Sequence, residues 1–176
     1  KGIELVGTWD VDPSNVDQIG ETLDKYNLKC VSIIPDHFGQ RKWGKGSLSA
    51  KDPDTRKMAL EYTYQCVEMA RTLKCKTLNL WPGQDGYDYI LQSNLVQERA
   101  WLMENIKEVA AASPDINFAL ENKCKEPRNY CIMARASDTL LLAKETGLDN
   151  VGVCIDTGHA LMGGENVAEA VVILQT

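Results

Sequence analysis

Short apolar runs alternate along this chain with longer segments in which apolar residues recur every three or four positions. The short runs are continuously apolar, as expected for strands that are covered on both faces. A run followed by a segment of helical period is typical of a parallel β-α unit. The expected strands are residues 3–6, 30–34, 77–81, 116–120 and 151–155.

Helices are predicted between these strands. The first covers residues 14–26 with Ser14 as its N-cap. The second begins after Asp52, a suitable N-cap, because Pro53 fits the first helical position. One face of this helix is apolar and is expected to face the core. That face consists of Met58, Tyr62, Cys66, Met69 and Leu73.

Three further helices complete the pattern. Residues 95–112 repeat the helical period, residues 131–146 end at Gly147, a good C′ residue, and a last helix starts at Asn166. The apolar positions of the first and last of these are Leu95, Leu102, Ile106 and Val109, then Val167, Val171 and Leu174.

Five parallel β-α units predict an α/β fold, a (β/α)8 TIM barrel of which residues 1–176 form a partial domain. A complete barrel has eight such units in about 250 residues. Five parallel strands alone would leave two unpaired edges. We therefore expect the chain to be part of a longer protein, cut at both ends, or to be completed by another polypeptide.

Composition narrows the class of protein. The chain has 176 residues, 44% of them hydrophobic and 25% charged, which suits one globular core. No apolar stretch reaches the roughly 18 residues of a membrane span, and no signal peptide is visible, so we expect a cytoplasmic protein without membrane partners. The net charge of −6 argues against nucleic acid as a partner. Six cysteines without paired spacing indicate reduced thiols.

Candidate functional residues follow the last two predicted strands. Glu121 directly follows residues 116–120, and Asp156 follows 151–155, with His159 three positions later. Carboxyl ends of parallel strands share one edge of a sheet, so these side chains are expected to meet. Two carboxylates and one imidazole favour Mn²⁺, with Mg²⁺ or Co²⁺ as alternatives, over a thiolate zinc site. Without the second cluster, Glu121 reads equally well as an ordinary loop glutamate.

Three other residues follow strands. Lys123 points the same way as Glu121 if the strand continues, and could stabilise a developing alkoxide or hold a substrate hydroxyl. Trp81 could form an apolar wall for a sugar ring, or could simply pack before a turn. His37 could contact substrate, or could be a loop histidine with no catalytic duty.

These residues resemble a known family. Residues 120–128, LENKCKEPR, closely resemble the Glu-x-Lys-x-x-Glu-Pro-Arg strand-end motif of xylose isomerase, and residues 152–166 resemble the following strand and loop. Residues 76–83 are similar too, and the match keeps its order from about residue 28 to 170. The resemblance implies that the strands correspond roughly to the second to sixth of a xylose isomerase-like barrel.

The resemblance also implies roles by position. Glu121 and Asp156 become metal ligands and His159 a metal or substrate contact. Lys123 becomes the charged helper of isomerisation, so the catalytic residues are Glu121 and Lys123. The expected substrate-binding residues are Trp81, His37 and Arg128.

Three departures place the chain outside xylose isomerase itself. No histidine follows the first strand near Val6, where the ring-opening histidine is expected. Gln84 and Asp85 replace an Arg-Glu pair, and the remaining metal ligands of the family lie on later strands. The resemblance therefore implies a cousin among sugar isomerases and epimerases.

The leading hypothesis is a metal-dependent sugar isomerase or epimerase that moves a proton or hydride next to a carbonyl. Its expected partner is a small-molecule sugar substrate. We also expect the chain to form a homo-oligomer or to bind another chain that completes the barrel. One alternative is a C-glycoside-cleaving lyase on the same barrel. Another is an abasic-site DNA endonuclease, whose Asp-Thr-x-His-Ala signature resembles residues 156–160. The motif at 120–128 and the acidic charge count against it. The last alternative function is that of a non-catalytic binding subunit.

Overall fold

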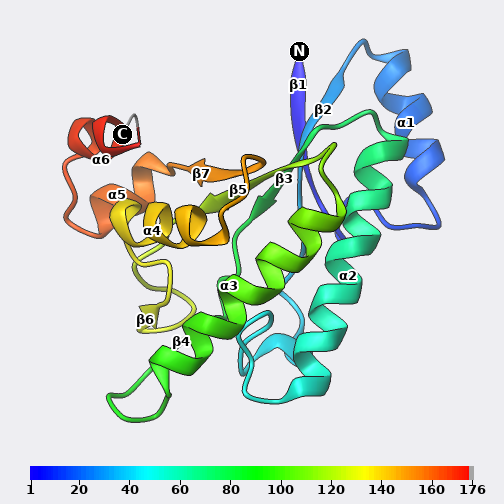
Figure 1. Ribbon diagram of the computed structural model, residues 1–176. Coiled ribbons are helices and arrows are strands. Elements are labelled where there is room, and N and C mark those ends of the chain that lie inside the picture. Colours follow the sequence, from blue (N-terminus) through cyan, green and yellow to red (C-terminus); the bar gives the residue numbers. More distant parts are fainter. Residues whose placement is uncertain (175–176) are drawn as a thin grey trace.

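A five-stranded parallel sheet forms the centre of the computed structural model, which describes residues 1–174 (Figure 1). The strand order is β1-β2-β3-β5-β7, so neighbours in sequence are neighbours in the sheet. All five predicted strands are confirmed, with each end within one residue of its expected place. The bounds are β1 Gly2–Val6, β2 Lys29–Ile34, β3 Thr77–Leu80, β5 Asn117–Glu121 and β7 Val151–Cys154.

This sheet is an open part of a TIM barrel. Within the described residues, β1 and β7 are edge strands and the sheet does not close on itself. Every strand pairing is parallel and every connection between neighbouring strands contains a helix, which is the β-α succession of the barrel. About five of the eight units are therefore present.

Six α-helices accompany the strands among residues 1–174. The second begins where the sequence predicts, since the Asp52 carboxylate accepts a hydrogen bond from the Asp54 backbone N and Pro53 takes the first helical position. The fourth ends at Gly147, whose φ of 69° is left-handed. The bounds are α1 Val16–Lys25, α2 Pro53–Thr72, α3 Leu95–Ala112, α4 Ala136–Thr146, α5 Thr157–Met162 and α6 Val167–Ile173, with a 3-10 turn at Arg41–Trp43.

Side chains of the central strands divide between two faces. Leu78 and Leu80 of β3, and Phe118 and Leu120 of β5, are fully buried in the core that the helices cover. Helices α2 and α3 run side by side over this core (Figure 1). Because side chains alternate along a strand, the residues between these leucines point to the opposite face, toward the interior of the barrel.

Four local predictions need correction. Helix α1 starts at Val16, because Ser14 bonds to the Asp12 carboxylate and does not cap the helix. Met58 and Leu95 are 44% and 42% exposed, although each shares a helical face with buried residues further along its helix. The helix expected from residue 131 begins only at Ala136.

Residue 131 instead belongs to a short antiparallel strand pairing that the sequence did not predict. Strand β4, Gly86–Tyr87, pairs antiparallel with β6, Tyr130–Cys131. A Cβ atom at Gly86 would collide with the Tyr130 carbonyl oxygen, so this close approach requires glycine. The pairing fastens the loop after β3 to the loop after β5. Among the described residues, no helix is long and apolar enough to cross a membrane.

Two glycine substitutions should change stability in opposite directions. Gly147→Ala places a Cβ in left-handed backbone and should lower the free energy of unfolding by about 1 kcal/mol. Gly20 lies inside α1, where an added Cβ would meet only Leu73 Cδ2 at 3.4 Å. Gly20→Ala should therefore raise the free energy of unfolding by up to about 1 kcal/mol. Urea unfolding of both variants measures the difference. Equal effects of the same sign would contradict the backbone explanation.

Candidate functional site

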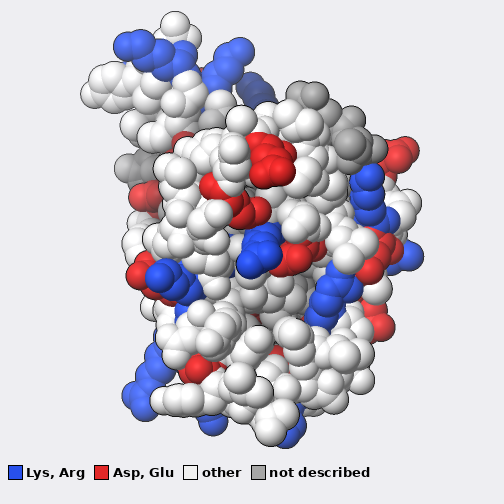
Figure 2. Space-filling view, turned by 90° about the vertical axis from the view of Figure 1, so that its left-hand side faces the viewer, with Lys and Arg blue, Asp and Glu red and all other residues white. Residues whose placement is uncertain are grey.

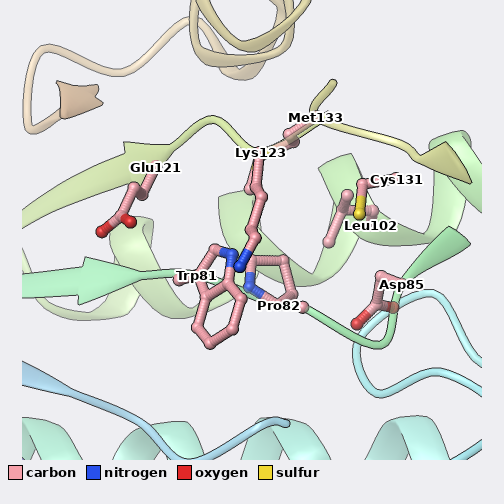
Figure 3. A pocket seen from close by; sticks show the side chains of 9 residues that line it. Trp81, Pro82, Asp85, Leu102, Glu121, Lys123, Cys131 and Met133 are labelled. Atoms are coloured by element: carbon pink, nitrogen blue, oxygen red, sulfur yellow. The ribbon is translucent and has the colours of Figure 1, made fainter. Parts of the chain in front are cut away.

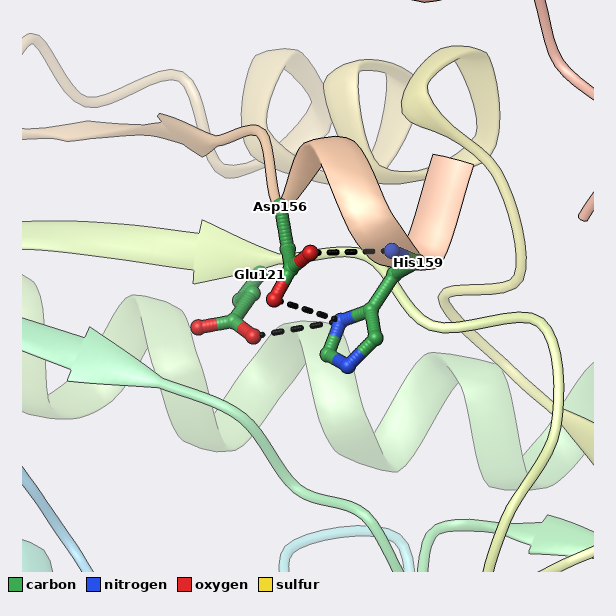
Figure 4. A group of neighbouring side chains, drawn as sticks. All are labelled: Glu121, Asp156 and His159. Atoms are coloured by element: carbon green, nitrogen blue, oxygen red, sulfur yellow. Dashed lines mark hydrogen bonds and ion pairs between the residues drawn. The ribbon is translucent and has the colours of Figure 1, made fainter. Parts of the chain in front are cut away.

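The ends of β5 and β7 bring together Glu121, Asp156 and His159 (Figure 4). One ligand atom from each lies within 4.8 Å of the others. Glu121 is the last residue of β5 and pairs in register with Cys154, two residues before Asp156. The parallel register therefore places the two carboxylates at one edge of the sheet, as the sequence predicts.

Helix α5 supplies the imidazole. The Asp156 carboxylate caps this helix by accepting a hydrogen bond of 2.9 Å from the His159 backbone N. The ring Nδ1 then lies 3.3 Å from Glu121 Oε1 and 3.4 Å from Asp156 Oδ2. It is also 3.0 Å from the Asn122 carbonyl oxygen, which fixes the ring direction by accepting from Nδ1–H. With Nδ1 donating in this way, Nε2 is the other ring nitrogen and makes no hydrogen bond to Asn122.

Glu121 is a buried acid held by an amide. Its side chain is 12% exposed, and its Oε2 accepts a 2.6 Å hydrogen bond from Asn79 Nδ2. Burial raises the pKa of this carboxyl above its usual value, while the Asn79 bond and the charge of His159 oppose the rise and Asp156 adds to it. Oε2 of the carboxylate is therefore bonded to Asn79, and Oε1 faces Asp156 and His159.

Lys123 and Trp81 form the wall beside this cluster (Figure 3). Lys123 Nζ lies 4.8 Å from the centroid of the Trp81 ring. The ring also stacks on His159, with centroids 6.2 Å apart, and packs against Phe38 at 4.5 Å. A small cavity opens here, and Glu121 lines it together with Lys123 and Trp81. An apolar ring, an ammonium group and a carboxylate thus face one space.

Asp85 anchors the loops around this cavity, and sequence reasoning missed it. Its carboxylate is 2% exposed and accepts hydrogen bonds from the backbone N of Ser47 and of Ser49, and from the Ser47 hydroxyl. Burial raises the pKa of Asp85, and these donors oppose the rise. The loop after β2 is thereby fixed to the loop after β3. The available signal was an acid in a segment, residues 77–98, that contains no basic residue.

His37, a predicted substrate contact, is buried in this structure, and its substrate role stays a prediction. Its side chain is 1% exposed and packs edge-on against Trp43 and Tyr62. Its Nε2 lies 3.3 Å from both the Ala59 carbonyl oxygen and the Thr63 hydroxyl. Burial lowers the pKa of His37 to about 4, so the ring is neutral. His37 is therefore a buried residue of the loop after β2.

Arg128, also a predicted substrate contact, ties two loops together in this structure, and its substrate role stays a prediction. Its guanidinium donates to the carbonyl oxygens of Gln84 and Gly44 and to the Asp88 carboxylate, at 2.7 Å from Oδ2. These partners belong to the loops that follow β2 and β3. The donors of the side chain are engaged there, away from the cavity.

Comparison with known proteins identifies the family. Residues 1–175 match the family model described as xylose isomerase-like TIM barrel. The chain belongs to this family. The resemblance found in the motifs at 120–128 and 152–166 is thereby confirmed.

Individual relatives agree with this assignment. A probable sugar isomerase of Rhizobium meliloti (strain 1021) is 33% identical over 143 residues, which cover 80% of this chain and 32% of that protein. The chain spans about a third of the curated relatives it matches. Crystal structures of a D-psicose 3-epimerase in the presence of D-fructose and of a D-tagatose 3-epimerase-like protein share the fold. The D-psicose 3-epimerase has a TM-score of 0.77 and 19% identity, and the match covers 97% of this chain and 58% of that one. The D-tagatose 3-epimerase-like protein has a TM-score of 0.77 and 24% identity, and the match covers 99% of this chain and 62% of that one.

Asn79→Ala should raise the pKa of Glu121, because the carboxylate loses the hydrogen bond that favours its charged form. Carboxyl carbon chemical shifts followed across pH in the metal-free full-length protein measure this change. Asn117→Ala is the matched control, since Asn117 is exposed and lies at the start of the same strand as Glu121. An unchanged Glu121 pKa in the Asn79 variant would contradict the positioning role of Asn79.

Proposed function

We propose that this chain carries part of the active site of a metal-dependent sugar isomerase or epimerase. The observation that carries the proposal is the Glu121, Asp156 and His159 cluster, whose ligand atoms lie within 4.8 Å of one another at adjacent strand ends. Family membership and relatives named as sugar isomerases support the substrate class. A monosaccharide or sugar derivative is the proposed substrate.

The residues present fit a divalent cation. Two carboxylates face one point from neighbouring strands, and like charges at this distance destabilise each other unless a cation lies between them. His159 contributes a ring nitrogen. Oxygen-rich ligands of this kind suit Mn²⁺, with Mg²⁺ or Co²⁺ as alternatives. When bound, the ion would supply a Lewis acid that polarises a carbonyl or hydroxyl oxygen of the sugar.

Glu121 is placed to move a proton. Burial raises its pKa toward the range in which a carboxyl can both take and return a proton, and Asn79 holds one of its oxygens. In the proposed reaction Glu121 takes the proton from the carbon next to the carbonyl. Return of this proton to the former carbonyl carbon, with transfer of the hydroxyl proton to the former carbonyl oxygen, would isomerise the sugar. Delivery of a proton by a second group to the opposite face of the first carbon would epimerise it.

Lys123 and Trp81 are placed to hold the sugar. The Lys123 ammonium is only 14% exposed and can donate to an oxygen that gains negative charge as the proton leaves. Trp81 and Phe38 offer adjacent ring faces to the apolar C–H side of a sugar. These groups orient the substrate between the aromatic wall and the carboxylates.

Charge distribution disfavours the endonuclease alternative. Basic and acidic side chains are interspersed on the face shown in Figure 2, without a continuous basic surface, and the net charge is −6. Phosphate-backbone binding draws its affinity from clustered Lys and Arg. We propose no nucleic-acid partner.

Further ligands are proposed to come from outside this chain. The described sheet presents β1 and β7 as open edges, and the chain spans about a third of its curated relatives. We propose that additional polypeptide, within a longer protein or from another subunit, completes both the barrel and the coordination of the metal. Tests of activity therefore use the full-length protein.

Removal of the metal should abolish turnover. Glu121→Gln and Asp156→Asn should each weaken Mn²⁺ binding by roughly 100-fold or more, because each removes a ligand charge. Isothermal titration and turnover of ketose substrates, before and after EDTA and Mn²⁺ addition, measure both effects. Glu104→Gln, on the exposed side of α3, is the control. Turnover that survives EDTA would contradict the proposal, and a broken carbon-carbon bond in the product would favour the lyase.

Lys123→Met should lower kcat by roughly 10²- to 10³-fold with a smaller change in KM, because the ammonium acts mainly on charge that develops during proton transfer. Lys125→Met removes an exposed lysine two residues away and should leave kcat near the wild-type value. Steady-state kinetics of the two full-length variants provide the comparison. Equal losses in both would indicate a disturbed loop and not a role for Lys123.

A further inference from the structure

The loop after β2 carries a cluster of basic side chains. Residues 41–51 contain four cations and no acid, in a chain whose net charge is −6. All four are exposed, and they line one surface hollow of about 610 Å³ between the 3-10 turn and the start of α2. The four are Arg41, Lys42, Lys45 and Lys51.

No carboxylate within residues 1–174 is paired with these cations. Arg41, Lys45 and Lys51 make no side-chain hydrogen bond or ion pair in that part of the chain. Arg71 and Arg128, by contrast, each lie 2.7 Å or less from a carboxylate oxygen. The cluster therefore differs from these arginines in having no counter-charge.

The one acid at the hollow is engaged in a helix cap. Among the described residues that line the hollow, only Asp52 has a carboxylate. Its oxygens accept hydrogen bonds from the Asp54 backbone N and, at 2.7 Å, from the Thr55 hydroxyl. Four cations thus face one acid, and clustered like charges repel each other. An anion bound among them would remove this repulsion.

One of the four cations is already oriented. Lys42 Nζ lies 4.5 Å from the centroid of the Trp43 ring and 5.8 Å from that of Tyr62. Trp43 is fully buried, so the ring face that attracts the ammonium has a fixed place. The Lys42 ammonium is therefore held on the loop by two aromatic rings.

The backbone of the loop is fixed as well. Beyond the loop anchors described above, Asn105 Nδ2 donates to the Leu48 carbonyl oxygen at 2.8 Å. Arg56 donates to the Ala50 carbonyl oxygen at 2.6 Å. A ligand that binds to a fixed backbone does not have to order it, so less entropy is lost on binding.

We propose that this hollow binds the phosphate groups of a small molecule. A phosphate monoester carries about two negative charges at neutral pH and several acceptor oxygens. The guanidinium fork of Arg41 and the ammonium groups of the lysines match such an anion. One carboxylate would leave most of the positive charge unneutralised. The volume of about 610 Å³ is in the range of small-molecule sites.

This phosphate site is separate from the candidate metal site. Among the described residues, none lines both the hollow and the cavity beside Glu121. The proposal goes beyond the proposed sugar chemistry and does not depend on it. Its test therefore measures binding and needs no turnover.

Isothermal titration of the full-length, metal-free protein with pyrophosphate tests the proposal, because without metal the probe forms no metal complex. The double variant Arg41→Gln/Lys45→Gln should weaken binding by roughly 10-fold or more, since it removes two charged donors. The control Lys107→Gln/Lys144→Gln removes the same charge from exposed positions on α3 and α4. It should change the affinity by no more than about two-fold, because distant exposed charges are screened.

Two further probes distinguish the source of the phosphate. Inorganic phosphate should bind more weakly than pyrophosphate, since it reaches fewer of the four cations. Fructose 1,6-bisphosphate that binds more tightly than pyrophosphate would assign the hollow to a sugar phosphate, and the reverse order would assign it to a polyphosphate. Either order supports the proposal if the Arg41→Gln/Lys45→Gln variant loses the binding.

Hydrogen exchange of the wild-type, full-length protein locates the probe without any substitution. Pyrophosphate should slow amide exchange in residues 41–55 and leave residues 121–128 unchanged. No measurable binding of pyrophosphate, equal weakening in the two double variants, or slower exchange confined to residues 121–128 would each overturn the proposal.

Discussion

The alternation of side chains along β3 and β5 is the constraint on which the rest of the structure depends. Leu78, Leu80 and Leu120 must point to the helices to build the core, so Asn79 and Glu121 must point the other way. A slip of one residue would exchange these faces and place an acid in the core. The same register that buries the apolar residues thus delivers a carboxylate and its amide partner to the interior of the barrel.

Burial makes this carboxylate chemically useful and also makes it depend on neighbours. A carboxylate with little water around it needs donors or cations to remain charged. Asn79 supplies one donor, and His159, oriented by the cap of α5, lies against the other oxygen. Helix capping and the cluster are linked, since Asp156 both caps α5 and belongs to the cluster.

Polar contacts add to apolar packing in holding the loops around the site. Asp85 fixes the loop after β2, and Arg128 binds three backbone or side-chain oxygens from two loops. The short β4–β6 pairing adds a third connection. Each of these contacts joins segments distant in sequence, so the aromatic wall of Trp81 and Phe38 keeps its place beside Lys123.

The sequence by itself determined the five strands, most helix bounds, the family and the meeting of Glu121, Asp156 and His159. These features follow from local period, capping residues and a compact motif, all of which act over a few neighbouring positions. Only the tertiary structure decided that His37 is buried, that Arg128 ties two loops together, and that Asn79 holds Glu121. The physical reason is that burial and side-chain partners depend on which distant segments pack together, and local pattern does not specify that packing.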